Sequence, residues 1–310
     1  MKGIHMENQI VHDKVIVVTG AGRGIGQAIA KMMSNHGAKL VVNDIGTSVH
    51  GEGADASPAQ ETAAQIKAAG GAAVASTDSV HQWDSAKRII ELALDTYGRI
   101  DGVVNNAAVL RDVIFHKMDP SDWQAVIDVV LSGSFYVSRA AAPYFRKQES
   151  GSYVHISSTS GLIGGTGQAN YGAAKIGLVG LSKGIALDMA RFNVRSNVVA
   201  PTAYTRMTES IPSTTQGYRD RILKRPQVPA EKNAPLAVFL MSDLAEKVSG
   251  QVFYSRNNEL ILFSQMRPKR SIHMCDGWTP ESIAQHMLPA LQQNFYPLDR
   301  TRDVFKSWLP

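Results

Sequence analysis

The stretch Val15-Ile-Val-Val-Thr-Gly20-Ala-Gly-Arg-Gly24-Ile-Gly26 decides the fold of this chain. Its first residues are mostly β-branched and apolar, which is typical of a buried strand. The glycines that follow permit tight or positive-φ turns, and residues 27–33 then show helical periodicity. Strand, glycine turn and helix, in this order, are the context in which a backbone cradles a pyrophosphate. Because the glycines at 20, 24 and 26 depart from the strict dinucleotide spacing, the turn alone is weak evidence.

A carboxylate ends the second predicted strand. The apolar run 39–43 leads into Asp44, eighteen residues after Gly26. An acid at this place accepts hydrogen bonds from the adenosine ribose hydroxyls and repels a 2′-phosphate. Because no arginine follows in residues 45–48 to neutralise that phosphate, we expect NAD rather than NADP. Arg23 is the reservation, since a basic residue in the glycine turn can hold a 2′-phosphate.

Ser158, Tyr171 and Lys175 have the spacing of a proton-transfer device. Lys175 follows Tyr171 by four residues, so both lie on one face if the segment is helical. The ammonium would then lower the pKa of a phenol that is about 10 when unperturbed. Ser158 follows the apolar run 153–156, and its hydroxyl would bond the same substrate oxygen. Tyr-x-x-x-Lys alone is common on helix surfaces. The catalytic interpretation is favoured because the same chain also carries the glycine turn.

Together these features resemble the short-chain dehydrogenase/reductase family. Residues 19–26 match its Thr-Gly-x-x-x-Gly-x-Gly pattern, residues 105–107 match Asn-Asn-Ala-Gly, and the serine, tyrosine and lysine match the catalytic pattern. The resemblance covers roughly residues 10–250. It implies an oxidoreductase that moves a hydride between a nicotinamide and a secondary alcohol carbon. Tyr171 would take the hydroxyl proton, Ser158 would hold the oxygen, and Lys175 would also grip the ribose.

The resemblance implies a set of cofactor-binding residues. Besides Tyr171 and Lys175, these residues are Gly20, Arg23, Gly24, Ile25, Gly26, Asp44, Asp78, Ser79, Asn105, Ala107, Pro201 and Thr205. We expect no metal site, because His5, His12 and His273 lack partners at metal-ligand spacing.

Three residues depart from the family pattern. Val130 stands where the family carries an asparagine. The resemblance assigns that position mainly a backbone carbonyl that holds a water of the proton relay, and valine retains a carbonyl, so loss of activity does not follow. Ala108 and Thr202 replace glycines and would place side chains near the nicotinamide.

Within the family, several segments look most like the (3R)-hydroxyacyl-CoA dehydrogenase part of peroxisomal multifunctional enzyme type 2 and its bacterial relatives. They are residues 41–46, 110–113, 133–141, 167–171 and 206–208. This likeness suggests a 3-hydroxyacyl-CoA, or a bulky alicyclic or steroid-like alcohol, as substrate. Two alternatives stay open. One is a catalytically weak nucleotide-binding protein, which the replacement of the family asparagine by Val130 suggests, and the other is a 3-oxoacyl-ACP reductase.

Composition agrees with an enzyme that is neither a membrane protein nor a nucleic-acid binder. The 310 residues are 44% hydrophobic, which can bury a large core. No stretch reaches the roughly 18 uninterrupted apolar residues of a membrane span, and no signal-peptide pattern opens the chain, so we expect a cytoplasmic protein. The net charge of +5 is mild, and no nucleic-acid motif accompanies it. A single cysteine excludes internal disulfides.

Alternation of strand-like and helix-like segments predicts an α/β fold with a Rossmann-type, doubly wound parallel sheet. We expect a dinucleotide-binding domain with the active site at 10–250 and a C-terminal extension at 251–310. Residues 251–255 and 260–264 flank Asn257-Asn258 as in a hairpin. Thr279-Pro280 then starts a helix whose apolar stripe we expect to pack on the same domain or on another subunit.

Two loops differ from ordinary connections. Residues 45–57 are longer than the usual strand-to-helix turn. A solvated insertion is favoured over a wall around the adenosine half of a ligand. Residues 204–228 lie where the family carries a substrate lid.

The remaining features have simpler explanations. His155 alternates within a strand and is interpreted as a satisfied core histidine. Arg267, Lys269 and Arg270 could meet CoA phosphates, but a solvated basic turn is favoured. The helices that we predict near residues 119–147 and from Tyr171 to about Arg191 carry more apolar residues than one buried face needs, so we expect a homodimer or homotetramer.

Overall fold

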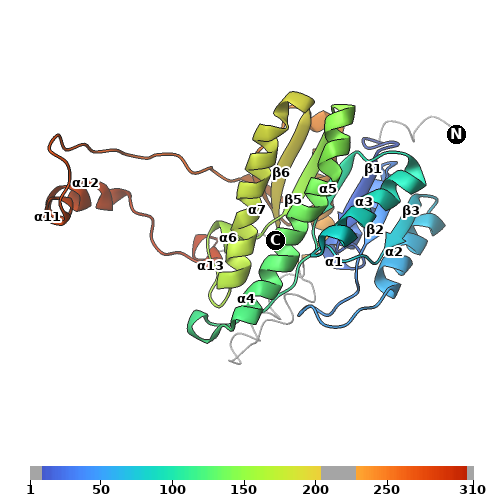
Figure 1. The fold of residues 1–310 in the computed structure, drawn as a ribbon, viewed down its shortest axis with the longest axis horizontal. Helices are drawn as coiled ribbons and strands as arrows, with labels where there is room; N and C mark the ends of the chain where they lie inside the picture. The colour runs from blue at the N-terminus through green and yellow to red at the C-terminus, as the bar shows by residue number, and fades with distance from the viewer. Residues whose placement is uncertain (1–8, 204–227, 306–310) are drawn as a thin grey trace.

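An eight-stranded sheet organises the protein, whose computed structural model describes residues 9–203 and 228–305 (Figure 1). The strand order is β3-β2-β1-β4-β5-β6-β7-β8, and only the β7–β8 pair of this sheet is antiparallel. This confirms the predicted α/β class. The strands are β1 Val15–Thr19, β2 Lys39–Asn43, β3 Ala72–Ser76, β4 Gly102–Asn105, β5 Gly151–Ile156, β6 Val194–Pro201, β7 Val252–Arg256 and β8 Glu259–Leu262.

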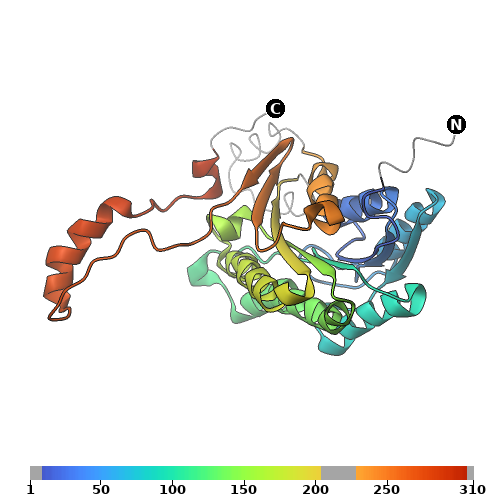
Figure 2. The same ribbon diagram turned by 90° about the horizontal axis from the view of Figure 1, so that it is seen from above.

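Helices cover both faces of the sheet (Figure 2). One layer contains α1 Gly24–Asn35, α2 Ser57–Ala68 and α10 Ala234–Met241. The other contains α3 Trp83–Tyr97, α5 Gly133–Gln148 and α7 Ala169–Asp188, with α4 Pro120–Val126 and α6 Thr159–Leu162 beside α7. Short 3-10 turns lie at Phe115–Lys117, Ala190–Phe192, Ala230–Asn233 and Asp243–Ala245.

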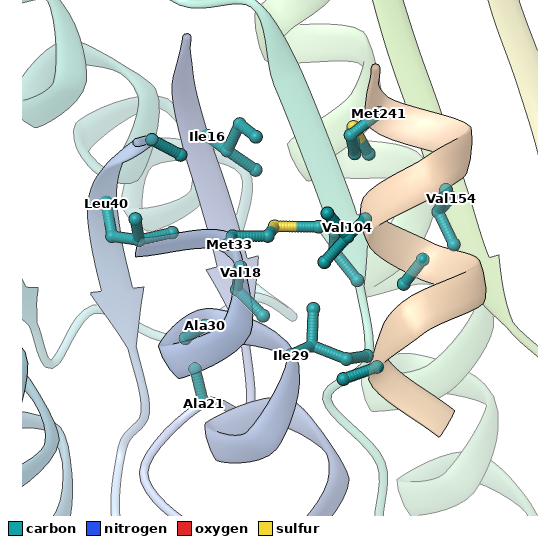
Figure 3. Close-up of a cluster of buried hydrophobic side chains, with 14 of the residues drawn as sticks. Ile16, Val18, Ala21, Ile29, Ala30, Met33, Leu40, Val104, Val154 and Met241 are labelled. Atoms are coloured by element: carbon teal, nitrogen blue, oxygen red, sulfur yellow. The ribbon is translucent and has the colours of Figure 1, made fainter. Parts of the chain in front are cut away.

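The core lies on both sides of β1, whose five residues are all buried. On the α1 side, Ile16 and Val18 point toward Ile29 and Met33 of α1 and toward Met241 of α10 (Figure 3). Fully burying an aliphatic side chain of this kind contributes about 1.5–3 kcal/mol. A strand covered on both faces carries an almost continuous apolar run, which is why residues 15–18 do not alternate with polar ones.

The helix that precedes β5 is continuous from Pro120 to Gln148 but changes pitch in its middle. Residues Ile127–Ser132 form a π-helical segment between α4 and α5. Among the described residues, this helix alone is long and apolar enough to cross a membrane by length and composition. One such match is weak evidence, because a core helix can pass the same test; 44% of the apolar window is buried in the body.

The C-terminal extension divides into a part that joins the body and a part that leaves it. The predicted hairpin is present and adds β7 and β8 to the main sheet. From Phe263 the chain then leaves the body, forms a short helix, and returns (Figures 1 and 2). The helix comprises α11 Pro280–Ser282, a π turn Ile283–Met287, α12 Leu288–Leu291 and a 3-10 turn Gln292–Asn294. We call residues 263–300 the arm.

The arm helix does not pack on the domain as the sequence predicts. It lies away from the body (Figure 1), and no residue from 257 to 305 is buried. The basic residues that precede it bond its C-terminal end: Arg270 donates to the Ala290 carbonyl at 2.6 Å and Lys269 to the Asn294 carbonyl at 3.4 Å. These cations therefore stabilise the negative end of a helix dipole, and their expected place in a solvated turn is only partly correct.

The chain returns to the body at α13 Thr301–Val304. Thr301 bonds the Gly164 carbonyl through its N–H and its hydroxyl, both at 3.2 Å. The Phe305 ring then packs against Tyr254, with 5.0 Å between ring centres. The arm is thus fixed to the body at both ends.

Candidate active site

The glycine turn between β1 and α1 has the backbone that its sequence requires. Gly20 and Gly24 have φ of 62° and 56°, in the left-handed region that side chains disfavour. A Cβ on Gly26 would collide with the Gly20 carbonyl. The turn is therefore closely wound, and the N-terminus of α1 opens beside it.

Thr19 and Asn106 fix this turn to the end of β4. The Thr19 hydroxyl accepts hydrogen bonds from the N–H groups of Asn106 at 3.0 Å and Ala107 at 3.1 Å. The Asn106 amide donates to the carbonyls of Thr19 at 3.0 Å and Gly20 at 2.9 Å. The Asn-Asn-Ala segment thus acts as a brace for the glycine turn. Asn106 was not among the predicted site residues, although the motif pointed to it.

Asp44 is held in place from two sides. Its Oδ2 accepts from the Gly22 N–H at 2.8 Å, and its Oδ1 accepts from the Gly46 N–H at 2.7 Å. These two bonds hold the carboxylate in one orientation. The charge therefore stands at the end of β2, against the glycine turn, where a ribose would lie.

A groove of about 370 Å³ runs along these carboxyl ends of the strands. Of the predicted cofactor-binding residues, it is lined by Gly20, Arg23, Gly24, Ile25, Asp44, Asp78, Ser79 and Ala107. The groove combines a glycine cradle, a helix N-terminus and a ribose-type carboxylate, so these residues fit a nicotinamide dinucleotide.

Other predicted cofactor residues lie outside the groove lining. Gly26 is buried in the first turn of α1, and Pro201 is the last residue of β6. Asn105 is buried and donates to the Ser138 hydroxyl at 2.8 Å. Thr205 and most of the expected lid lie outside the described residues.

The long loop after β2 is a wall of the groove, contrary to the solvated insertion that the sequence favoured. Its residues Ile45, Thr47, Ser48, Val49, Gly51 and Gly53 line the groove. The loop crosses to the segment after β4, where the Val49 carbonyl accepts from the Leu110 N–H at 2.9 Å and His50 Nδ1 lies 3.1 Å from the Leu110 carbonyl. These contacts join segments about 60 residues apart, which is why loop length alone could not reveal them.

The three catalytic candidates come together from the turn between β5 and α6 and from α7. Ser158 caps α6, and its hydroxyl accepts from the Ser160 N–H at 3.1 Å. Tyr171 lies in the first turn of α7, and Lys175 lies one turn later with its Nζ 5.4 Å from the centre of the Tyr171 ring. Lys175 is 2% exposed and donates to the Ile156 carbonyl at 2.6 Å.

The acidity of Tyr171 differs from the sequence-based expectation. Burial raises the pKa of Tyr171, the charge of Asp112 raises it further, and hydrogen bonding with Ser158 lowers it. Burial also lowers the pKa of Lys175 to about 7, so its ammonium group loses its proton more readily than that of an exposed lysine. The expected lowering of the phenol pKa by Lys175 is therefore wrong for this arrangement, because desolvation and a nearby carboxylate dominate.

The departures from the family pattern have visible consequences. Val130 is fully buried in the π-helical segment, and its carbonyl accepts from the Ser134 hydroxyl at 2.6 Å. Val130 thus keeps the backbone carbonyl that the family pattern requires, and this carbonyl already has a side-chain donor. Ala108 lines the groove, whereas the Thr202 hydroxyl donates to Tyr254 at 2.8 Å.

His155 is a core histidine but not a fully satisfied one. It is completely buried, and burial lowers its pKa to about 3. Its Nδ1 lies 3.2 Å from the Asn105 amide nitrogen, while its Nε2 has no hydrogen-bond partner among the described residues. The imidazole is therefore neutral, in agreement with a structural role.

Comparison with known sequences places these features in a family. The sequence model described as "short chain dehydrogenase" matches residues 14–216. A Mycobacterium tuberculosis protein named as a short-chain type dehydrogenase/reductase is 51% identical over 201 residues, which are 65% of this chain and 70% of that protein. The peroxisomal hydratase-dehydrogenase-epimerase of Saccharomyces cerevisiae is 38% identical over 299 residues. That match covers 95% of this chain, which spans about a third, 32%, of the yeast protein.

Solved structures give the same result. A short chain dehydrogenase from Mycobacterium avium superposes with a TM-score of 0.81 and 35% identity, over 93% of this chain and 97% of that one. A 7α-hydroxysteroid dehydrogenase, in complex with NADH and 7-oxo glycochenodeoxycholic acid, superposes with a TM-score of 0.72 and 26% identity. That match covers 81% of this chain and 96% of the other.

Proposed function

The chain belongs to the short-chain dehydrogenase/reductase family of oxidoreductases, which use nicotinamide cofactors, and from that premise we propose that it interconverts a secondary alcohol and a ketone with NAD. The preferred substrate in this proposal is a 3-hydroxyacyl-CoA, and a bulky alicyclic or steroid-like alcohol is the second candidate. One observation carries the proposal. Ser158, Tyr171 and Lys175 meet at the carboxyl ends of the strands, at the same edge as the groove that Asp44 lines.

Each of the three residues has a distinct task in this proposal. In the direction of oxidation, Tyr171 in its phenolate form accepts the hydroxyl proton of the alcohol as its carbon loses a hydride, and Ser158 hydrogen-bonds the oxygen throughout. The bound cofactor supplies the hydride acceptor. Lys175 stands one turn behind Tyr171, and because its pKa is lowered to about 7, it can exchange a proton near neutral pH.

The preference for NAD follows from Asp44. Its carboxylate is fixed by two backbone N–H groups, so it cannot swing away from a 2′-phosphate that would meet it with like charge. Arg23 lines the same groove and is exposed. Its guanidinium is the feature that could favour NADP.

The similarity to a yeast protein whose name joins a hydratase to a dehydrogenase supports the thioester substrate. A hydratase adds water across a double bond and leaves an alcohol, which a dehydrogenase can then oxidise. The likeness to a structure with a bound bile acid derivative supports the alicyclic candidate.

One activity screen tests both the substrate and the cofactor. Purified protein would be assayed with 3-hydroxyacyl-CoA thioesters of both configurations, free hydroxysteroids and simple cyclic alcohols, each with NAD and with NADP. We expect turnover of a thioester and a higher kcat/KM with NAD. Turnover of free alcohols without thioesters would remove the CoA substrate, and a higher kcat/KM with NADP would overturn the role of Asp44. No turnover of any secondary alcohol would favour the nucleotide-binding alternative.

We also propose that the protein forms a homodimer or homotetramer through α5 and α7. Phe135 and Tyr144 on α5 and Leu187 on α7 are 46%, 38% and 74% exposed. Cβ atoms added at Gly180 and Gly184 of α7 would meet no atom within 4 Å. A second copy could therefore approach this face closely, and two-fold pairing is the commonest closed assembly. Light scattering at micromolar concentration would contradict the proposal if it gave the monomer mass of 33.6 kDa.

A further inference from the structure

A network of side chains connects Asp112 to the catalytic serine. Asp112 Oδ2 accepts from the Gln168 amide at 2.8 Å, and Gln168 Oε1 accepts from the Ser160 hydroxyl at 2.7 Å. The N–H of Ser160 donates to the Ser158 hydroxyl at 3.1 Å. A Cβ on Gly165 would lie only 2.6 Å from Gln168 Oε1. Both ends of the Gln168 amide are therefore occupied, and a side chain at position 165 would collide with it.

The backbone beside Asp112 is tied to the start of the helix that carries Tyr171. The Val113 N–H donates to the Gly167 carbonyl at 2.9 Å. The buried Asn170 amide donates to the carbonyl of the residue before Asp112, also at 2.9 Å. The segments 110–113 and 167–171, which the sequence analysis marked separately, thus form one packed unit next to the catalytic residues.

The second carboxylate oxygen of Asp112 is an orphan. Oδ1 is inaccessible to solvent and has no hydrogen-bond partner in the part of the chain that the structure describes. An unsatisfied buried acceptor costs about 1–3 kcal/mol. Burial raises the pKa of Asp112, whereas the bond from Gln168 and the charge of His50 lower it. A group kept in so unfavourable a place calls for a functional explanation.

We propose that Asp112 is a positioning residue of the catalytic centre: its carboxylate holds Gln168 and, through Ser160, the turn that carries Ser158, while its charge stands close to Tyr171. This inference rests on the oxidoreductase function proposed above. The negative charge favours the neutral phenol, which donates a proton to a ketone oxygen, over the phenolate that alcohol oxidation needs. Oxidation therefore requires a higher pH than it would without Asp112.

Other charged or titratable groups face this pair from the neighbouring described elements. Lys175 lies one turn along α7 from Tyr171. His50 approaches Asp112 from the loop after β2, and Arg111 pairs with Glu52 of the same loop at 3.5 Å. A substitution that removes the Asp112 charge leaves all of these in place, so its effect can be assigned to one carboxylate.

The pH dependence of kcat/KM for alcohol oxidation tests the proposal. Asp112→Asn keeps an oxygen that can accept from Gln168 but removes the charge, so the midpoint of the profile should move to lower pH by about one unit. Ser160→Ala breaks the link between Gln168 and the turn of Ser158 but leaves the bond from Gln168 to Asp112 in place. It should lower the plateau of kcat by about tenfold, as expected for one hydrogen bond, and leave the midpoint unmoved. Asp188→Asn makes the same charge change at an exposed site on α7, and its profile should match that of the parent.

An Asp112→Asn profile that coincides with the parent profile would overturn the charge effect, and an unchanged plateau in Ser160→Ala would overturn the positioning. A measurement without substrate separates this result from the proposed function. In the presence of NAD, the tyrosinate absorbance of each protein would be titrated, and the same titration of its Tyr171→Phe derivative would be subtracted. Ionisation of Tyr171 at lower pH in Asp112→Asn supports the inference even if no alcohol is turned over. Coincident titrations would reject it.

Discussion

The catalytic body and the arm of residues 263–300 are built from similar sequence patterns but differ in what covers their apolar side chains. In β1 every residue is buried, and α1 and α10 close over it. In the arm Met266 and Tyr296 are each 85% exposed, and Leu298 is fully exposed. An apolar stripe therefore predicts that one face of an element will be buried, but it does not show which part of the protein, or which other molecule, buries it.

The arm gains its order locally instead. Thr279 and Ser282 form a reciprocal capping box at its helix N-terminus, with bonds of 3.2 and 2.9 Å. Arg270 bonds the opposite end of the helix. Caps and end charges contribute roughly 0.5–2 kcal/mol each, which is small beside the burial in the body. The two regions should thus respond differently to the same substitutions.

The largest contrast is expected for tyrosine. Tyr171→Phe removes the proposed acid/base and should lower turnover by on the order of 10²-fold or more, with little change in fold or cofactor binding. Tyr296→Phe makes the same change in the arm, where the ring lies 4.7 Å from Lys269 Nζ and keeps that contact, so turnover should not change. Steady-state kinetics on a confirmed substrate, with circular dichroism and NADH fluorescence as controls, measures both. Wild-type turnover in Tyr171→Phe would show that the proposed mechanism is wrong.

Leucine separates the two regions by stability. Leu40→Ala opens a cavity between β2 and its neighbours, since Leu40 is fully buried, and should lower the free energy of unfolding by about 2–5 kcal/mol. Leu298→Ala removes the same atoms from an exposed place and should change it by less than about 0.5 kcal/mol. Denaturant unfolding at several protein concentrations measures both. If Leu298→Ala were as destabilising as Leu40→Ala, a second molecule would have to cover the arm in solution.

The smallest effect is expected where the body departs from its family. Val130→Asn restores the side chain that the family carries in the proton relay. Because the relay can use the Val130 carbonyl and one hydrogen bond contributes about 1 kcal/mol, turnover should change by less than about tenfold. The pre-steady-state rate of NADH formation checks this. An increase in turnover of more than tenfold in Val130→Asn would mean that Val130 slows proton transfer in the natural protein.

The fold was predictable from the sequence because its signals are local. The β1–turn–α1 unit, Asp44 at the end of β2 and the tyrosine four residues before its lysine are each read within about 30 residues. The missed features depend on distant contacts. Asp112 reaches Gln168 across 56 positions, and nothing in the Tyr-x-x-x-Lys spacing indicates that a carboxylate will raise the pKa of the tyrosine. The wall formed by residues 45–53 and the projection of the arm were missed for the same reason.

One aromatic ring marks both ends of the arm. Tyr254 packs against Phe263 where the arm leaves, at 6.3 Å between ring centres, and against Phe305 just after it returns, at 5.0 Å. The arm is therefore a closed loop on a fixed base. The entropy of closing such a loop grows only with the logarithm of its length, by about 0.6 kcal/mol per doubling. Insertions and deletions between the two contacts should hardly alter the stability of the body. The length of the arm can therefore vary among related proteins without a cost in folding.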